Sequence, residues 1–210
     1  MPSVYWFWKR GTEVLILISL VPLLKLNRGI LAIALLICVA VACKQLQSLG
    51  RPTVLTSPDG KFQLTVPAGW QERPSLHAKA TIKAANVFEE TYVIVISENK
   101  IDFASDMTLD TFTDLTRGAM LSKVKEGDST PPLPVKINGN DGRQYVLEGV
   151  VDNIRISYLI TAVETAEHYH QIITWTLRSR IDQKQATLLK VTESFRPTNV
   201  AQTSSPASEP

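Results

Sequence analysis

The sequence predicts an α+β protein in which helices pack on a single antiparallel β-sheet, preceded by an N-terminal signal or anchor segment. Three observations support this prediction. Short β-branched or alternating segments recur between turn residues, as in the strands of an antiparallel sheet. Two segments have helical apolar spacing, one in the interior and one near the C-terminus. The first 43 residues are strongly apolar and contrast with the polar remainder.

The first predicted strand, residues 61–66, follows the turn Ser57-Pro58-Asp59-Gly60, in which Pro fixes φ and Gly tolerates a positive φ. Its apolar residues alternate with polar ones, which indicates one buried face. Residues 80–85 form a weaker strand candidate. Residues 91–97 are apolar at both odd and even positions, so we expect this strand to lie centrally with both faces covered.

The interior helix is predicted over residues 108–121. Thr108 is the expected N-cap, and Asp110 suits the positive end of the helix dipole. The apolar residues expected to face the core are Leu109, Phe112, Leu115 and Met120.

The C-terminal helix is predicted to begin at Ser179-Arg-Ile-Asp182, which has the form of a capping box, and to continue through Ser194. Pro197 closes it. The residues expected to face the core are Leu188, Val191, Thr192 and Phe195.

Four further strands are predicted between the helices, after a loop at residues 123–134. The turn signals Asn138-Gly139 and Asp152-Asn153 separate the first three, which indicates hairpins. The fourth completes a meander. The four segments are residues 135–137, 143–151, 154–163 and 168–177.

The N-terminal segment, residues 1–43, predicts a signal peptide or a membrane anchor. Lys25 and Arg28 precede an apolar run of signal-peptide length, and the run ends at Ala40-Val41-Ala42-Cys43. This ending resembles the lipobox of bacterial lipoproteins, which implies cleavage before Cys43 and lipid attachment to its sulfur. Two alternatives stay open: translation that starts near Leu26, and an uncleaved anchor in which Cys43 is incidental. Either way, the rest of the chain is expected outside the cytoplasm.

The rest of the chain divides into three predicted parts. Residues 44–52 are a short polar tether, residues 53–197 one globular domain, and residues 198–210 a disordered tail rich in Ser, Thr, Ala and Pro. The globular part contains no cysteine, since Cys38 and Cys43 both precede it. It therefore has no disulfide, thiolate nucleophile or Cys-ligated zinc.

Charge makes nucleic acid an unlikely partner class. Four of the 22 basic residues and one of the 20 acidic residues lie in the first 43, which leaves a net charge of −1 on the rest. Binding to a phosphate backbone needs clustered Lys and Arg, and no such cluster is visible.

Three short segments resemble the PsbP/DcrB-like family, which includes photosystem II extrinsic subunits, bacterial envelope lipoproteins and a small Ran-binding nuclear factor. They are Ser57-Pro-Asp-Gly-Lys-Phe62, Val66-Pro-Ala-Gly-Trp70 and Val191-Thr-Glu-Ser-Phe195. The resemblance spans residues 53–197. It implies a PsbP-like α/β/α sandwich, with a six- or seven-stranded antiparallel sheet flanked by helices, and a role without catalysis. No binding residue of the family maps onto this chain.

The pair His168 and His170 is the first candidate for site chemistry, because both side chains lie on one side of a predicted strand near Glu164 and Glu167. Imidazoles and a carboxylate could bind zinc or copper. The alternation favours a structural role, with the histidines on a polar face and the intervening residues facing the core. We therefore predict no metal site and no cofactor. The core-facing residues would be Tyr169, Ile173, Trp175 and Leu177.

Three other groups are weaker candidates. Residues 138–142 lack the oxygen spacing of an EF-hand and are interpreted as a hairpin turn. Four carboxylates could serve in acid–base chemistry, but nothing in the sequence places them together. Four aromatic residues are expected in or at the edge of the core unless a subset forms an exposed patch. The carboxylates are Glu89, Glu90, Asp102 and Asp106, and the aromatic residues are Trp70, Tyr145, Tyr158 and Trp175.

These observations favour a membrane-tethered, extracytoplasmic lipoprotein with a non-enzymatic binding or assembly role toward a protein partner in or at the membrane. One alternative is a lumenal accessory or assembly factor of a photosynthetic thylakoid complex. Another is a small envelope hydrolase or metal-dependent enzyme, which would need polar residues converging in a deep pocket. Motifs for nucleophilic, zinc-dependent or nucleotide-dependent catalysis are missing from the sequence.

Overall fold

The computed structural model describes residues 50–198. The predicted signal or anchor segment with Cys43, most of the tether and nearly all of the predicted tail lie outside these residues. The first strand begins at Thr53 and the last ends at Pro197. Within residues 50–198, no helix has the length and apolar character needed to cross a bilayer.

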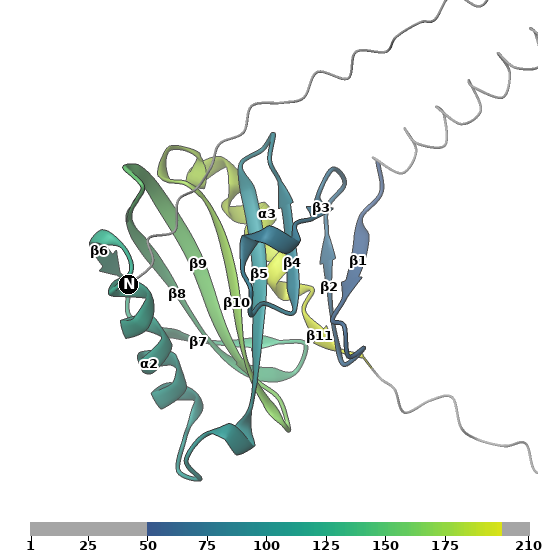
Figure 1. Ribbon diagram of the computed structural model, residues 1–210, viewed down its shortest axis with the longest axis vertical. Helices are drawn as coiled ribbons and strands as arrows, with labels where there is room; N and C mark the ends of the chain where they lie inside the picture. The colour runs from purple at the N-terminus through teal and green to yellow at the C-terminus, as the bar shows by residue number, and fades with distance from the viewer. Residues whose placement is uncertain (1–49, 199–210) are drawn as a thin grey trace, which may run out of the picture. The chain divides into compact units, whose positions relative to one another are not determined.

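The main sheet of the described residues has eight strands, and every pairing in it is antiparallel (Figure 1). The N-terminal hairpin and the C-terminal meander meet where β5 pairs with β10. In spatial order the strands are β3 (Gln71–Glu72), β4 (Ile82–Asn86), β5 (Thr91–Asn99), β10 (His168–Leu177), β9 (Ile154–Glu164), β8 (Asn140–Val151) and β6 (Lys125–Ser129), with β7 (Leu133–Ile137) also paired to β8.

A second, three-stranded sheet shows that the prediction of a single sheet is wrong. It consists of β1 (Thr53–Thr56), β2 (Phe62–Val66) and β11 (Arg196–Pro197), with β2 in the middle. Only β2 was predicted, because β11 has two residues and β1 four, too few for a periodic signal. The α+β class itself is confirmed.

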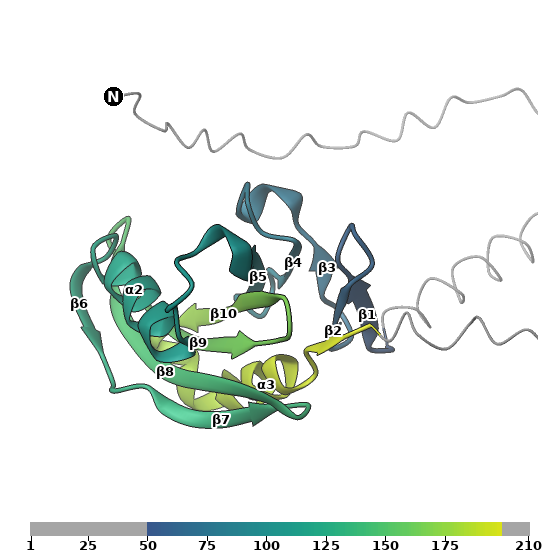
Figure 2. The same ribbon diagram turned by 90° about the horizontal axis from the view of Figure 1, so that it is seen from below.

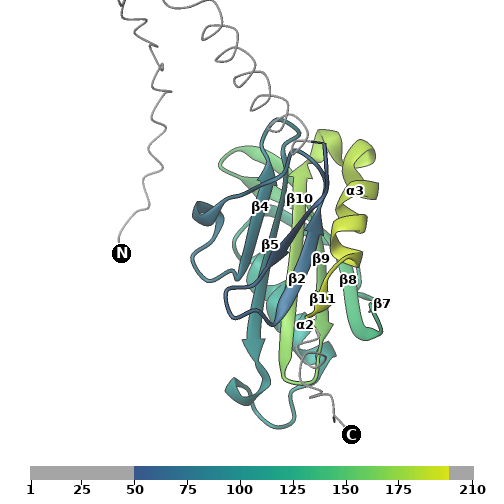
Figure 3. The same ribbon diagram turned by 90° about the vertical axis from the view of Figure 1, so that its right-hand side faces the viewer.

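Two helices cover opposite faces of the main sheet: α2 (Leu109–Leu121) and α3 (Ile181–Glu193). Phe112 of α2 packs with Tyr169 of β10, whereas Leu188 of α3 packs with Ile172 of the same strand. Positions 169 and 172 differ by an odd number, so they lie on opposite faces. Figure 2 looks along the strands and shows the helices on either side of β9 and β10. Figure 3 shows that the small sheet lies beside α3 over the same face.

The predicted central position of β5 is confirmed. The strand lies between β4 and β10, and both of its faces are covered. Val93 and Val95 are fully buried on the α3 side, and Ile94 is buried on the α2 side.

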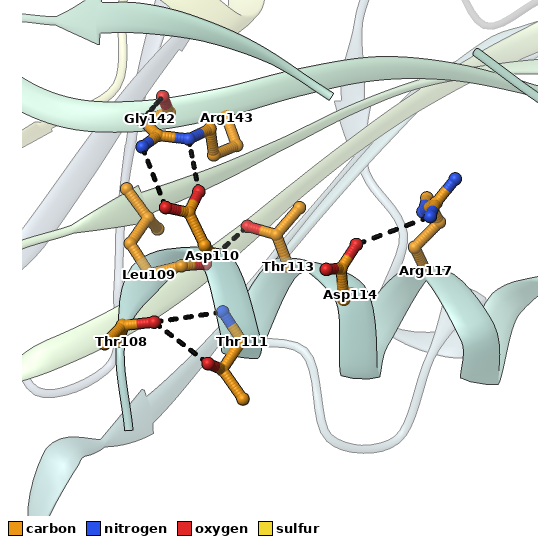
Figure 4. Close-up of polar contacts among 9 residues, drawn as sticks. All are labelled: Thr108, Leu109, Asp110, Thr111, Thr113, Asp114, Arg117, Gly142 and Arg143. Atoms are coloured by element: carbon orange, nitrogen blue, oxygen red, sulfur yellow. Dashed lines mark hydrogen bonds and ion pairs between the residues drawn. The ribbon is translucent and has the colours of Figure 1, made fainter. Parts of the chain in front are cut away.

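The helix α2 begins as predicted, and three of its four predicted core-facing residues pack inward: Leu109, Phe112 and Met120. The Thr108 hydroxyl accepts a hydrogen bond from the Thr111 amide at 3.1 Å, which confirms the N-cap (Figure 4). Leu115, predicted to face the core, is 57% exposed. Thr113 and Thr116 are buried instead, and their hydroxyls donate to backbone carbonyls of the preceding turn.

The predicted capping box at the start of the C-terminal helix is wrong. Residues Arg178–Arg180 form a 3₁₀ turn, and α3 begins at Ile181 without a side-chain cap. The predicted core-facing residues are confirmed: Leu188, Val191 and Thr192 of α3 are buried, and so is Phe195, which follows the helix.

The segment predicted as a loop, residues 123–134, contains β6 and the start of β7. Four of the five β6 residues are exposed, so the strand has no apolar alternation that sequence could reveal. It lies along β8, where Gly149 leaves room for Val124; a Cβ at Gly149 would lie 2.7 Å from Val124. Both predicted hairpin turns are confirmed by positive φ at Asn138-Gly139 and Asp152-Asn153.

Candidate functional site

The histidine pair lies in the core between the two sheets, so its predicted placement on a polar face is wrong. His170 is fully buried and His168 is 6% exposed. The Phe62 ring of the small sheet packs edge-on against both imidazoles, with ring centroids 4.3 Å from His170 and 5.1 Å from His168. From the alternation along β10 we expected only the face of Tyr169 and Ile173 to be covered. The small sheet, which was not predicted, covers the histidine face as well.

Hydrogen bonds to two hydroxyls fix the His170 ring. Its Nε2 lies 3.0 Å from the Thr165 hydroxyl oxygen, and its Nδ1 lies 2.9 Å from that of Ser97. Burial lowers the pKa of His170 to about 3, so the imidazole is neutral at physiological pH. Burial also lowers the pKa of His168.

The carboxylates near the histidines bind cations of the protein. Glu164 Oε1 lies 2.6 Å from Lys100 Nζ, and Glu167 Oε2 lies 3.6 Å from Lys61 Nζ. Among residues 50–198, no group of three or more His, Cys, Asp or Glu side chains could hold a metal ion. The absence of bound metal stays a prediction.

The four carboxylates considered for acid–base chemistry are not brought together. Glu89 and Glu90 lie in the β4–β5 turn, where they pair with Lys184 and Arg180. Asp102 and Asp106 follow the other end of β5, a strand of nine residues and therefore about 30 Å long.

The turn at residues 138–142 is confirmed as a hairpin connection. The side-chain Nδ2 of Asn138 donates to the carbonyls of Glu193 and Phe195, both at 2.8 Å, and so ties the hairpin to the end of α3. Its function in the fold is therefore structural.

The four aromatic residues occupy the core and its edge, as expected. Trp70 and Tyr145 are buried. Tyr158 and Trp175 are half-buried on the α2 side, where Trp175 stacks on Tyr92 with centroids 5.1 Å apart and Tyr158 lies 6.0 Å from Trp175.

The strongest candidate site is a surface cavity of about 570 Å³ at the end of β5, which we call the distal cavity. It lies between η2 (Lys100–Asp102), the segment leading into α2, and the adjoining ends of β9 and β10. In Figure 1 this end of the sheet is at the bottom. The lining residues are Lys100, Ile101, Phe103, Ala104, Ser105, Met107, Glu164 and Tyr169.

A packed aromatic cluster forms the apolar part of the distal cavity. The Tyr169 ring stacks on Phe112 of α2, with centroids 4.8 Å apart, and meets Phe103 edge-on at 5.8 Å. The Tyr169 hydroxyl donates to the Met107 carbonyl at 2.8 Å. Contacts on three sides therefore fix the ring before any ligand binds.

An ion pair forms the polar part of the distal cavity. The Lys100 and Glu164 side chains are 29% and 34% exposed, and the Lys100 ammonium lies 5.2 Å from the Tyr169 ring centroid. The ammonium is thus held both by a carboxylate and by the face of an aromatic ring. Either charged group can still hydrogen-bond a ligand through its exposed side.

The helix α2 holds the Met107 side of the cavity in place. Asp110 of its first turn accepts two hydrogen bonds from Arg143 of β8, from Nε at 2.6 Å and from Nη2 at 3.2 Å (Figure 4). The same guanidinium donates to the Gly142 carbonyl at 3.0 Å. Such a bidentate pair fixes orientation as well as distance, so the start of α2 is anchored to the sheet.

The lining suits binding better than catalysis. It contains neither His nor Cys, and its hydroxyls are those of Ser105 and Tyr169. The Lys100 and Glu164 side chains pair with each other, and the Tyr169 hydroxyl donates to a backbone carbonyl, so neither charged group is hydrogen-bonded to a hydroxyl of this lining. At the rim, Ile101 is 89% exposed and offers an apolar side chain to a partner.

Of the lining residues, only Glu164 and Tyr169 were considered from the sequence, and neither as part of this site. The cavity joins segments that are more than 60 residues apart along the chain, as the hydrogen bonds from Lys100 to Glu164 and from Tyr169 to Met107 show. The one local signal is Ile101, an apolar residue between two charged ones.

The solved structures that are similar to this chain include CyanoP and LpqN. Cyanobacterial PsbP (CyanoP) from Synechocystis sp. aligns with 71% of this chain and 94% of its own, at 15% identity and a TM-score of 0.53. LpqN of Mycobacterium tuberculosis, involved in cell envelope biogenesis, aligns with 70% of this chain and 91% of its own, at 12% identity and a TM-score of 0.52. No protein-family model matches the sequence, and no curated protein matches it. These likenesses support a PsbP-like fold, which is the fold that the sequence resemblance implied.

Proposed function

We propose that this protein is a membrane-tethered, extracytoplasmic lipoprotein, attached through Cys43, that binds a protein partner in or at the membrane and does not catalyse a reaction. The lipobox-like sequence ending at Cys43 supports the tether. The PsbP-like fold, which LpqN of cell envelope biogenesis also has, supports a role of this kind outside the cytoplasm.

The distal cavity is the observation on which the binding role depends. Its aromatic residues are already packed against one another, so binding there orders few additional side chains. Removing an exposed Ile from water is worth about 1.5–3 kcal/mol, and Ile101 stands at the rim where a partner can cover it. An apolar side chain of the partner would occupy the cavity, and a polar group beside it would bind Lys100 or Glu164.

Site-specific photocrosslinking in native membranes tests this function. A photoreactive residue in place of Ile101 should give one discrete protein adduct. The matched control is Leu133 on β7, which is 66% exposed and does not line the distal cavity. The same adduct from both positions, or none from position 101, would contradict partner binding at the cavity.

The tether is tested separately. Membrane fractionation and acyl labelling of the wild type should place the chain in the membrane with lipid on Cys43. A wild-type chain recovered free of the membrane would contradict the tether whatever the crosslinking shows.

A further inference from the structure

The β4–β5 turn, residues 87–90, exposes an aromatic side chain at its tip. Phe88 is 92% exposed and Val87 is 43% exposed. The turn is well defined, because the Glu89 amide donates to the Asn86 side chain at 3.2 Å and Glu90 has a φ of 51°. The backbone therefore holds Phe88 away from the domain, where it contributes nothing to the core.

The carboxylates next to Phe88 are matched by cations of the same domain. Glu89 pairs with Lys184 of α3, and Glu90 Oε2 lies 2.8 Å from Arg180 Nε. The tip therefore presents the apolar Phe88 side chain, and the two carboxylates beside it are neutralised by ion pairs. This matters for a surface of anionic headgroups, which repels free carboxylates.

The tip lies at the end of the domain where the chain leads in from the predicted tether. Thr53, the first residue of β1, pairs with Val66 at the end of β2. The turn that follows β2 reaches the end of β4: a Cβ at Gly69 would lie 3.2 Å from the side-chain Nδ2 of Asn86. Figures 1 and 3 show the start of β1 and the β4–β5 turn at the same end.

The length of the tether allows the tip to reach a bilayer. Ten residue steps separate Cys43 from Thr53, and they span at most about 35 Å when fully extended. A lipid on Cys43 would hold Thr53 within that distance of the membrane. Val54 of β1, at the same end, is 50% exposed.

We propose that the Phe88 tip inserts into the interface of the bilayer that carries the lipid anchor, and so orients the domain with the distal cavity away from the membrane. This proposal rests on the proposed tether. Aromatic and aliphatic side chains partition into the interface, and the covalent anchor removes most of the entropic cost of bringing them there. The partner of this turn is therefore the lipid surface.

Photocrosslinking of the full, processed chain in vesicles tests the insertion. The vesicles contain phosphatidylethanolamine and phosphatidylglycerol with radiolabelled phosphate, a label that the protein's own lipid anchor does not carry. The variants are Phe88→p-benzoylphenylalanine and, as the matched control, Ile101→p-benzoylphenylalanine. Both positions are about nine-tenths exposed, so neither change disturbs the fold.

The expected result is a labelled phospholipid adduct at position 88 at least several-fold stronger than at position 101. Equal labelling at the two positions, or no lipid adduct at position 88, would overturn the insertion. Flotation of the vesicles before irradiation distinguishes this failure from failure of the tether. If the processed chain does not float, the proposed tether is wrong and the insertion is wrong with it.

Discussion

Burial of His170 makes the stability of the domain depend on pH. The imidazole has an ordinary pKa of 6.5 in the unfolded chain and of about 3 in the native state. Between these values the unfolded chain binds a proton that the native state does not, so the free energy of unfolding rises with pH. The stabilisation is complete above the unfolded pKa and is lost as the pH falls below 6.5.

The magnitude follows from these two pKa values. Lowering the pH from about 7 to about 5 should remove about 2 kcal/mol of the free energy of unfolding through His170 alone. His168 and His77 add to the loss in the same direction, because burial lowers the pKa of each. The contribution of His170 must therefore be isolated by substitution.

Urea unfolding of a fragment of residues 50–198, followed by tryptophan fluorescence, measures this dependence. In His170→Gln the amide can donate to one hydroxyl neighbour and accept from the other, but it does not titrate. The variant should lose about 2 kcal/mol less than the wild type between about pH 7 and about pH 5. His77→Gln, at a half-buried position, should keep most of the wild-type dependence. If His170→Gln and the wild type lose the same free energy, the reasoning from burial is refuted.

Three further predictions concern the core, the anchor and metal content. Phe112→Ala should lower the free energy of unfolding by about 3–5 kcal/mol because the ring is fully buried, whereas Leu115→Ala should change it by less than about 0.5 kcal/mol; urea unfolding compares them. Cys43→Ser should leave an uncleaved precursor without acyl label, as gel mobility and fatty-acid labelling would show; an acylated variant would exclude that sulfur. Elemental analysis after dialysis should find no stoichiometric zinc or copper on the tag-free domain, and one metal per chain that is lost in His168→Ala/His170→Ala would reverse this prediction.

The elements that were predicted correctly are those whose own residues show the burial, backbone conformation or capping that the fold requires of them. Strand β5 has apolar residues at odd and even positions, and both of its faces are covered. The turns at Asn138-Gly139 and Asp152-Asn153 need positive φ, which these residues tolerate better than most. Helix α2 begins directly after Thr108, because this N-cap side chain accepts a hydrogen bond from an otherwise free backbone amide.

The elements that were missed depend on a partner strand. Strand β6 is polar and exposed, and it exists because the edge of β8 offers it hydrogen bonds. The two residues of β11 pair with β2 only after α3 has returned the chain to the small sheet. Local periodicity contains no information about either pairing.

The histidine pair shows the same limit at a single position. His170 alternates with apolar residues along β10, which in a two-layer fold would place it in water. The small sheet forms a further layer on that face, and Phe62 covers the imidazole. The burial of His170 therefore depends on the small sheet, and two of the three strands of that sheet, β1 and β11, are too short to be predicted from the sequence.

The two proposed contact regions lie at opposite ends of β5 and can be tested independently. Thr91 follows the Phe88 turn, and Asn99 precedes the Lys100–Asp102 turn of the distal cavity. About 30 Å of rigid strand, buried in the middle of the main sheet, separates the two ends. Ile101→Ser should therefore leave unchanged the lipid adducts of a photoreactive residue at position 88, and Phe88→Ser should leave unchanged the protein adduct of a photoreactive residue at position 101. An effect of either substitution on the adduct at the other position would contradict the proposal that two separate surfaces make these contacts.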